Sequence, residues 1–133
     1  MMASVRKQTL IDADPERVWD ALRDWASPHL RLVRGFVTAT RLDGEDRIVT
    51  FFNGAEVREV LIDLDDKQRR LVWSVVGGPY SHHNASAQVI PTDDGGSEFV
   101  WIADFLPDES AERMDHMMER GITAVRDTLN PHG

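Results

Sequence analysis

Apolar residues recur in this chain with two different periods, and each period predicts a different kind of element. Over residues 107–129 they return every three or four positions, which places them on one face of an α-helix. That face consists of Ala111, Met114, Met118, Ile122, Val125 and Leu129. Pro107 is typical of a helix start, Pro131 ends the helix, and Arg113 is expected on its polar side. Gly121 costs helix stability relative to alanine, so we expect a close approach to a sheet or a bend there.

Two shorter helices are predicted near the start of the chain. Asp14-Pro15-Glu16 combines a capping residue, a proline suited to the first helical position and an acid that complements the helix dipole. The apolar residues that follow at helical spacing are Val18, Trp19, Leu22 and Trp25. Ser27-Pro28 repeats the start signal and predicts a second short helix that ends near Val33.

The remaining segments show the alternation and turn residues of strands. The predicted strands are 4–11, 36–42, 47–52, 56–64, 71–77, 81–90 and 98–106. Asp43-Gly44 and Asn53-Gly54 favour tight hairpins, and Gly78-Pro79 is a further turn signal. We therefore expect an α+β domain in the order β-α-α-β-β-β-β-β-β-α, with a twisted antiparallel sheet covered by the last helix. A concave space between sheet and helix is where ligands usually bind.

Composition narrows the range of functions. A chain of 133 residues is expected to form one domain, residues 1–133, and the absence of cysteine excludes thiolate zinc sites and a cysteine nucleophile. With 15 basic and 23 acidic residues, the formal charge of −8 argues against nucleic acid and anionic membranes as partners. The exception would be a basic cluster of Arg31, Arg34 and Arg41. No signal peptide or membrane span is recognised, which predicts a cytoplasmic protein without stable membrane association.

Four stretches in order along the chain resemble one known superfamily. They are residues 12–19 (DADPERVW) at the first helix, 58–66 with Arg58-Glu59-Val60-Leu61 before an acidic turn, 74–84 with a Gly-Gly turn, and 101–107 before the last helix. They resemble the helix-grip (START-like, SRPBCC) superfamily of lipid carriers, birch-pollen-allergen-like proteins, plant abscisic-acid receptors and polyketide cyclases/dehydrases. The resemblance implies a helix-grip fold, in which a curved seven-stranded antiparallel sheet wraps around the C-terminal helix.

The same resemblance implies a set of ligand-binding residues. They are Ile48, Phe52, Val57, Glu59, Trp73, Val75, His82, Ala85, Ala87 and Val100, with Met118 and Ile122 closing the cavity from the helix. Where the hormone receptors hold the ligand carboxylate with a lysine, this chain has Leu32, with Arg31 beside it. Val100 replaces the pocket acid of the receptors, so abscisic-acid recognition is not expected. The implied cavity is largely apolar, with Glu59 and His82 as its polar points.

Glu59 and His82 are the candidate catalytic residues. A carboxylate in an apolar pocket could serve as general acid or base, but Glu59 could instead face solvent or pair with Arg47 or Arg58. His82 and His83 are adjacent in a strand entry, so their side chains point to opposite faces, and the resemblance assigns His82 to the pocket. The other three histidines lack metal-ligand spacing, so we expect no metal.

Three functions remain open. The first is binding of a small hydrophobic ligand, which could be aromatic, polyketide-like or lipid-like. The second is a polyketide cyclase/dehydratase that uses Glu59 or His82 and needs no cofactor, because positioning a flexible chain against itself lowers the barrier. The third is a protein-interaction module that docks through Arg31 and Arg34 and has a filled cavity. The sequence leaves a homodimer open.

Overall fold

The computed structural model describes residues 3–77 and 80–130, and over these it confirms the expected element order. Its elements are β1 (Ala3–Ile11), α1 (Pro15–Arg23), α2 (Pro28–Arg31), β2 (Val37–Asp43), β3 (Asp46–Phe51), β4 (Glu56–Asp65), β5 (Arg70–Val76), β6 (His82–Pro91), β7 (Ser97–Leu106), the 3-10 turn η1 (Asp108–Ser110) and α3 (Ala111–Leu129). The last helix thus begins after a 3-10 turn rather than directly at Pro107. The turn expected at Gly78-Pro79 and the helix stop at Pro131 lie outside the described residues.

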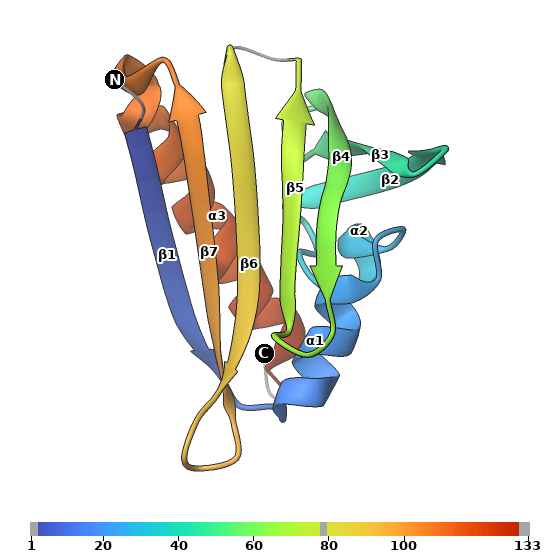
Figure 1. Cartoon of the computed structure of the whole chain (residues 1–133), viewed down its shortest axis with the longest axis vertical. Coiled ribbons are helices and arrows are strands. Elements are labelled where there is room, and N and C mark those ends of the chain that lie inside the picture. The colour runs from blue at the N-terminus through green and yellow to red at the C-terminus, as the bar shows by residue number, and fades with distance from the viewer. Residues whose placement is uncertain (1–2, 78–79, 131–133) are drawn as a thin grey trace.

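The seven strands form one antiparallel sheet in the order β1-β7-β6-β5-β4-β3-β2. Strands β2 to β7 form a meander, and β1 returns to pair with β7 along its whole length. Helix α3 crosses one face of the sheet behind β1, β7 and β6 (Figure 1), and Lys7 of β1 reaches across to Asp115 and Glu119 of this helix at 2.9 and 3.0 Å. The odd-numbered side chains of β1 therefore face α3.

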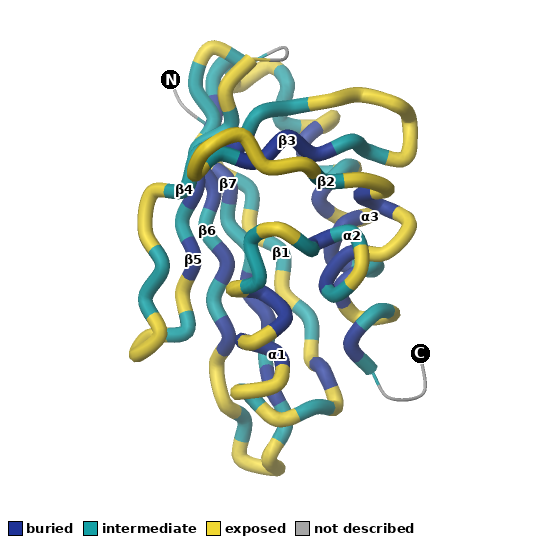
Figure 2. The backbone as a smooth tube through the Cα atoms, turned by 90° about the vertical axis from the view of Figure 1, so that its right-hand side faces the viewer, coloured by how far each residue is buried: buried dark blue, intermediate teal, exposed yellow. Residues whose placement is uncertain are grey.

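The sheet curves strongly, so that β2 and β3 run across the direction of β5, β6 and β7 (Figure 1). The pairing register shifts between Val37 and Ala39 in β2, and between Leu61 and Asp63 in β4. Such irregularities bend a strand and increase its twist, which turns the β2–β4 part of the sheet toward the helix. Buried and more exposed residues alternate along the strands (Figure 2), so one face carries the core.

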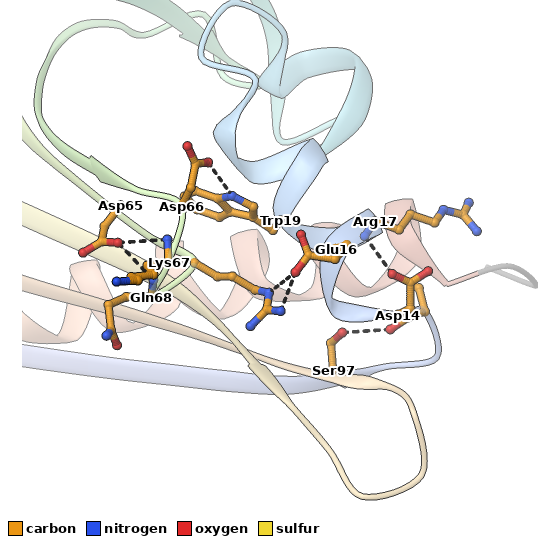
Figure 3. A network of polar contacts seen from close by, with 11 residues as sticks. Asp14, Glu16, Arg17, Trp19, Asp65, Asp66, Lys67, Gln68 and Ser97 are labelled. Atoms are coloured by element: carbon orange, nitrogen blue, oxygen red, sulfur yellow. Dashed lines mark hydrogen bonds and ion pairs between the residues drawn. The ribbon is translucent and has the colours of Figure 1, made fainter.

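A network of polar contacts holds α1 against one end of the sheet (Figure 3). The Trp19 indole nitrogen donates to Asp66 Oδ1 at 2.8 Å, Arg69 forms an ion pair with Glu16, and Asp14 caps the helix with its side chain. The first two of these contacts connect the first helix with the turn between β4 and β5. Because these polar groups already bind one another, we assign this end of the molecule a role in stability rather than in ligand binding.

Gly121 sets how closely α3 approaches the sheet. A Cβ atom at this position would lie 2.6 and 2.9 Å from two ring atoms of Trp101, and 3.1 Å from the Phe36 ring. The close approach that we expected at this glycine is therefore present. None of the helices that the structure describes is both long and apolar enough to cross a membrane.

Candidate functional site

A cavity of about 530 Å³ lies between the curved sheet and the N-terminal part of α3. Its walls are mostly apolar and include Leu22, Leu32, Val33, Phe36, Phe51, Leu71, Phe99, Trp101, Met114 and Met117. Pockets that bind small molecules have volumes of this order and a similar mixture of apolar walls with a few polar groups. The space therefore has the size and the character of a ligand site.

Seven of the residues predicted for this cavity do line it: Val57, Glu59, Trp73, Val75, Ala85, Ala87 and Met118. Five do not, namely Ile48, Phe52, His82, Val100 and Ile122. In four of the five cases the error is one position along the chain, because successive strand side chains point to opposite faces. The residues that line the cavity instead are Val49, Phe51, His83, Phe99 and Trp101.

Apolar residues on both faces of a strand explain two of these errors. Ile48 and Val100 are 9 % and 5 % exposed, yet each lies between neighbours that face the cavity. Hydrophobicity alone does not show which face of such a strand looks inward. At His82 the strand period gives the correct answer. Ala85 and Ala87 face the cavity, so a two-residue period selects His83 and not His82.

The cavity side of α3 is rotated relative to the prediction. Around the helix axis, Met117 and Arg113 lie on one side of Met118 and line the cavity. Ile122 lies on the other side of Met118 and does not. Ile122 is 5 % exposed, so it belongs to the core without bordering the cavity. Arg113, which we expected on the polar side, is exposed and lines the cavity at the same time.

Glu59 forms a buried ion pair with Arg47. Of the alternatives for this residue, the unpaired carboxylate is therefore wrong and the pairing with Arg47 is confirmed. Arg47 Nε donates to Glu59 Oε1 at 2.8 Å, and Nη2 lies 2.7 Å from the same oxygen. Arg47 Nη1 donates to the Trp25 carbonyl at 3.1 Å, and the guanidinium stacks 3.8 Å from the Trp25 ring centre. Glu59 Oε2 accepts no hydrogen bond from another described residue, so a cavity-lining carboxylate keeps one oxygen available.

Two cavity-lining side chains carry a buried nitrogen without a hydrogen-bond partner among the described residues: His83 Nδ1 and Trp101 Nε1. Burial, followed by the charge on neighbouring His82, lowers the pKa of His83 to about 4. The imidazole is therefore neutral near pH 7. Its ring packs 5.3 Å from the Tyr80 ring and 6.5 Å from the Phe105 ring, centre to centre.

Tyr80, which packs against His83, and Arg113 also line the cavity, and neither was predicted. Burial raises the pKa of Tyr80, while the positive charge of Arg113 opposes this rise, so the phenol is neutral near pH 7. We call Tyr80, His83 and Arg113 the polar rim. Tyr80 lies outside the strands and Arg113 falls outside the main apolar period of its helix, so neither gave a periodic signal.

The strand register places Glu59 and His83 in one row across the sheet. Glu59 pairs with Arg47 on one side and with Val75 on the other. The pairing of Ser74 with Asn84 sets His83 next to Val75. Glu59 and His83 are thus two strands apart, roughly 10 Å, on the face that lines the cavity. A flat ligand over Val75 would have a carboxylate on one side and a neutral imidazole on the other.

Two arginines of the basic cluster, Arg31 and Arg41, have acidic neighbours, whereas the exposed Arg34 has none among the described residues. Arg31 contacts Asp20 at 2.6 Å and Asp24 at 2.8 Å, and Arg41 lies 3.8 Å from a glutamate. Within the described part of the chain, Arg34 therefore keeps a free positive charge, while that of Arg31 is shared with two aspartates. Within residues 3–77 and 80–130, no three histidine, aspartate or glutamate side chains are grouped as metal ligands would be.

Comparison with known proteins places these features in context. A family model described as "Polyketide cyclase / dehydrase and lipid transport" matches residues 2–130. No curated protein matches the chain.

Solved structures of low sequence identity share the fold. An uncharacterised protein from Bacillus thuringiensis is 22% identical, with 96% of this chain and 98% of that chain covered at a TM-score of 0.83. A protein from Nitrosospira multiformis is 18% identical, with 98% of each chain covered and a TM-score of 0.84. A Thalictrum norcoclaurine synthase point mutant, in complex with a transition-state analogue, is 15% identical over 98% of this chain and 92% of that chain, with a TM-score of 0.72.

Proposed function

This chain belongs to the polyketide cyclase/dehydrase and lipid transport family, and on that premise we propose that its cavity binds a small hydrophobic molecule. The ligand would be aromatic, polyketide-like or lipid-like. The observation that carries the proposal is the cavity of about 530 Å³ with mainly apolar walls between the sheet and α3. Burying an apolar ligand there would release about 25 cal/mol for each Å² of apolar surface removed from water.

The kinds of residue in the walls fit a ligand with flat or irregular apolar parts. Phe51, Phe99 and Trp101 offer aromatic surfaces from the sheet side. Met114 and Met117 face them from α3, and methionine adapts its flexible side chain to irregular shapes. The unpaired His83 and Trp101 nitrogens provide a few points for orienting polar atoms of the ligand.

The alternative of a docking module with a filled cavity has less support. It relied on Arg31 and Arg34, and of these Arg31 is held by two aspartates, whereas Arg34 has no acid partner among the described residues. It also relied on a cavity without space, whereas this one has the volume of a ligand pocket. The expectations of a cytoplasmic location, of function without a cofactor and of a homodimer remain predictions from the sequence.

A pair of neighbouring substitutions tests ligand binding. Val75 lines the cavity, whereas Val76 follows it in β5, points to the other face and is 51 % exposed. We expect Val75→Trp to fill the space and reduce binding of the neutral fluorescent probe N-phenyl-1-naphthylamine at least tenfold. Val76→Trp should bind the probe like the original protein. Circular dichroism checks that both variants fold, and equal binding by the two variants would place the probe elsewhere.

A cyclase/dehydratase activity is the second candidate, and the row that contains Glu59 and His83 favours it. With an aromatic polyketone bound over Val75, Glu59 would remove a proton next to a ketone. The resulting enolate carbon would attack a second carbonyl of the same chain, and the neutral His83 would donate a hydrogen bond to the developing oxyanion. His82, the residue first expected in this role, does not line the cavity.

This activity is testable apart from binding. Turnover of an aromatic polyketone, followed by mass spectrometry of the products, should fall at least a hundredfold in Glu59→Gln while the variant still binds the neutral probe. Glutamine keeps an oxygen that can accept from Arg47. Unchanged cyclisation in Glu59→Gln, or release of the polyketone without conversion by the original protein, would exclude the catalytic role and leave binding.

A further inference from the structure

On the basis of the ligand-binding function proposed above, we propose that the ligand is an anionic amphiphile. Its single acidic group, a carboxylate or a group of similar charge, would bind to Arg113 at the polar rim. Its apolar body would lie between α3 and the sheet.

The cavity has an excess of one positive charge, although the whole chain carries −8. Its charged lining residues are Arg47, Glu59 and Arg113, among the residues that the structure describes. Arg47 and Glu59 neutralise each other at 2.7 Å. Arg113 has no carboxylate within ion-pair distance in the described part of the chain, while eight other basic side chains do. An anion would therefore be favoured and a cationic ligand would be repelled.

Arg113 is placed where an acidic head group can remain partly hydrated. It lies in the first turn of α3 and is exposed, whereas Met114 and Met118 on the same helix are buried beside the cavity. A ligand that enters with its apolar part first would leave its charge at this exposed guanidinium. Because the charge would not have to leave water completely, the desolvation cost of binding it would be small.

The deeper arginine is a poor alternative site for the anion. Arg47 already donates through Nε to Glu59 and through Nη1 to the Trp25 carbonyl. An anion placed there would lie next to the Glu59 carboxylate and would be repelled by it. Arg113 has no such neighbour among the residues that line the cavity.

Tyr80 and His83, which pack against each other, add neutral polar groups to the cavity that Arg113 lines. The Tyr80 hydroxyl forms no hydrogen bond with another described residue, and the His83 Nδ1 atom is buried without a partner. A hydroxyl can donate to a carboxylate oxygen, and a neutral imidazole has one nitrogen that donates. A cation with adjoining neutral donors is the arrangement that recognises a carboxylate.

A pair of probes of equal shape separates this proposal from ligand binding in general. The probes are 4-(1-pyrenyl)butanoic acid and its primary amide, titrated by fluorescence at low and high salt. We expect the acid to bind about tenfold more tightly than the amide, and only the acid to weaken as salt is added. In Arg113→Gln the acid should lose about tenfold in affinity while the amide changes less than twofold.

Arg126→Gln is the matched control, because Arg126 lies on the same helix, is exposed and does not line the cavity. It should leave both affinities unchanged. Equal binding of acid and amide by the original protein, or an equal loss of both in Arg113→Gln, would overturn the anionic head group and leave the proposed function intact. Failure of both probes to bind would overturn the proposed function itself.

Displacement then identifies the apolar body of the ligand. Dodecanoic acid and 2-naphthoic acid compete with the pyrenyl acid, each compared with its own amide. Displacement by the acid but not by the amide supports the proposal, and the more effective acid shows whether the body is aliphatic or aromatic. Displacement by acid and amide alike contradicts it.

Discussion

The polar groups on the concave side of the sheet fall into two regions that differ in how well they are satisfied. At the Arg47–Glu59 pair, three guanidinium nitrogens have acceptors, and Trp25 stacks on the charge. At the polar rim, Arg113 has no acid partner in the described chain. The buried His83 Nδ1 atom has no hydrogen-bond partner there. Groups that satisfy one another hold the fold together, whereas groups without partners can bind a ligand.

Breaking the buried pair is expected to have the largest effect on stability. Arg47→Ala leaves the Glu59 charge buried without a partner, which costs about 3 to 5 kcal/mol of unfolding free energy. Urea denaturation measures this loss. The double variant Arg47→Met with Glu59→Leu should regain most of it, because no unpaired charge remains. A single-variant loss below about 1 kcal/mol would show that the pair is not structural.

Acid should lower the stability of the folded protein through His83. The pKa of His83 is lowered to about 4 in the folded protein, against about 6.5 in an unfolded chain, so the unfolded state binds the proton first. Stability should therefore fall as the pH drops from about 6.5 to about 4, by about 2 to 3 kcal/mol from this residue.

Variants separate the contribution of His83 from that of the acidic side chains. His83→Phe should remove the part of the pH dependence above pH 4.5, as measured by thermal unfolding at a series of pH values. His116→Gln, a change outside the cavity, should keep it. An identical pH profile for His83→Phe and the original protein would contradict the assignment.

Alanine at Gly121 should destabilise the protein, although alanine normally favours a helix. Its Cβ would meet the Trp101 ring at 2.6 Å, and overpacking of this kind costs about 1 to 3 kcal/mol. Helix propensity alone would instead give a gain of about 1 kcal/mol, so the sign of the change decides between the two effects. Gly121→Ala combined with Trp101→Leu should recover stability in urea denaturation.

Removing the rim charge should have the smallest effect on stability. Arg113 is exposed and has no ion pair within the described residues, so Arg113→Gln should change the unfolding free energy by less than about 0.5 kcal/mol. Thermal unfolding without ligand measures this. A loss comparable to that of Arg47→Ala would mean that the rim, like the buried pair, supports the fold, and the distinction between the two regions would fail.

Most of the fold could be predicted from the sequence because it depends on periodicity and turn residues. The spacing in α3 and the capping signal at Asp14 each identified a helix. The cavity was harder, since choosing the inward face of a strand depends on one position. Ile48 and Val100 are as apolar as the neighbours that line the cavity, so only the three-dimensional register separates them.

The polar residues of the site were harder to predict, because their arrangement depends on contacts between residues that are distant in the sequence. The sequence offered Arg47 and Arg58 as partners for Glu59, and only the register of β3 with β4 shows which one turns inward beside it. Tyr80, which lies outside the strands, and Arg113, in the first turn of α3, both line the cavity although they share no sequence pattern. A strict two-residue period would have selected His83, whereas no periodic signal would have found Arg113.

Native mass spectrometry of the purified protein, followed by denaturing extraction, tests the central claim most directly. The proposed function predicts that the protein carries one apolar molecule per chain, which is absent from Val75→Trp and retained by Val76→Trp. A protein without bound mass, whose melting temperature no aromatic or lipid-like compound raises, would contradict the claim that the cavity is a ligand-binding site.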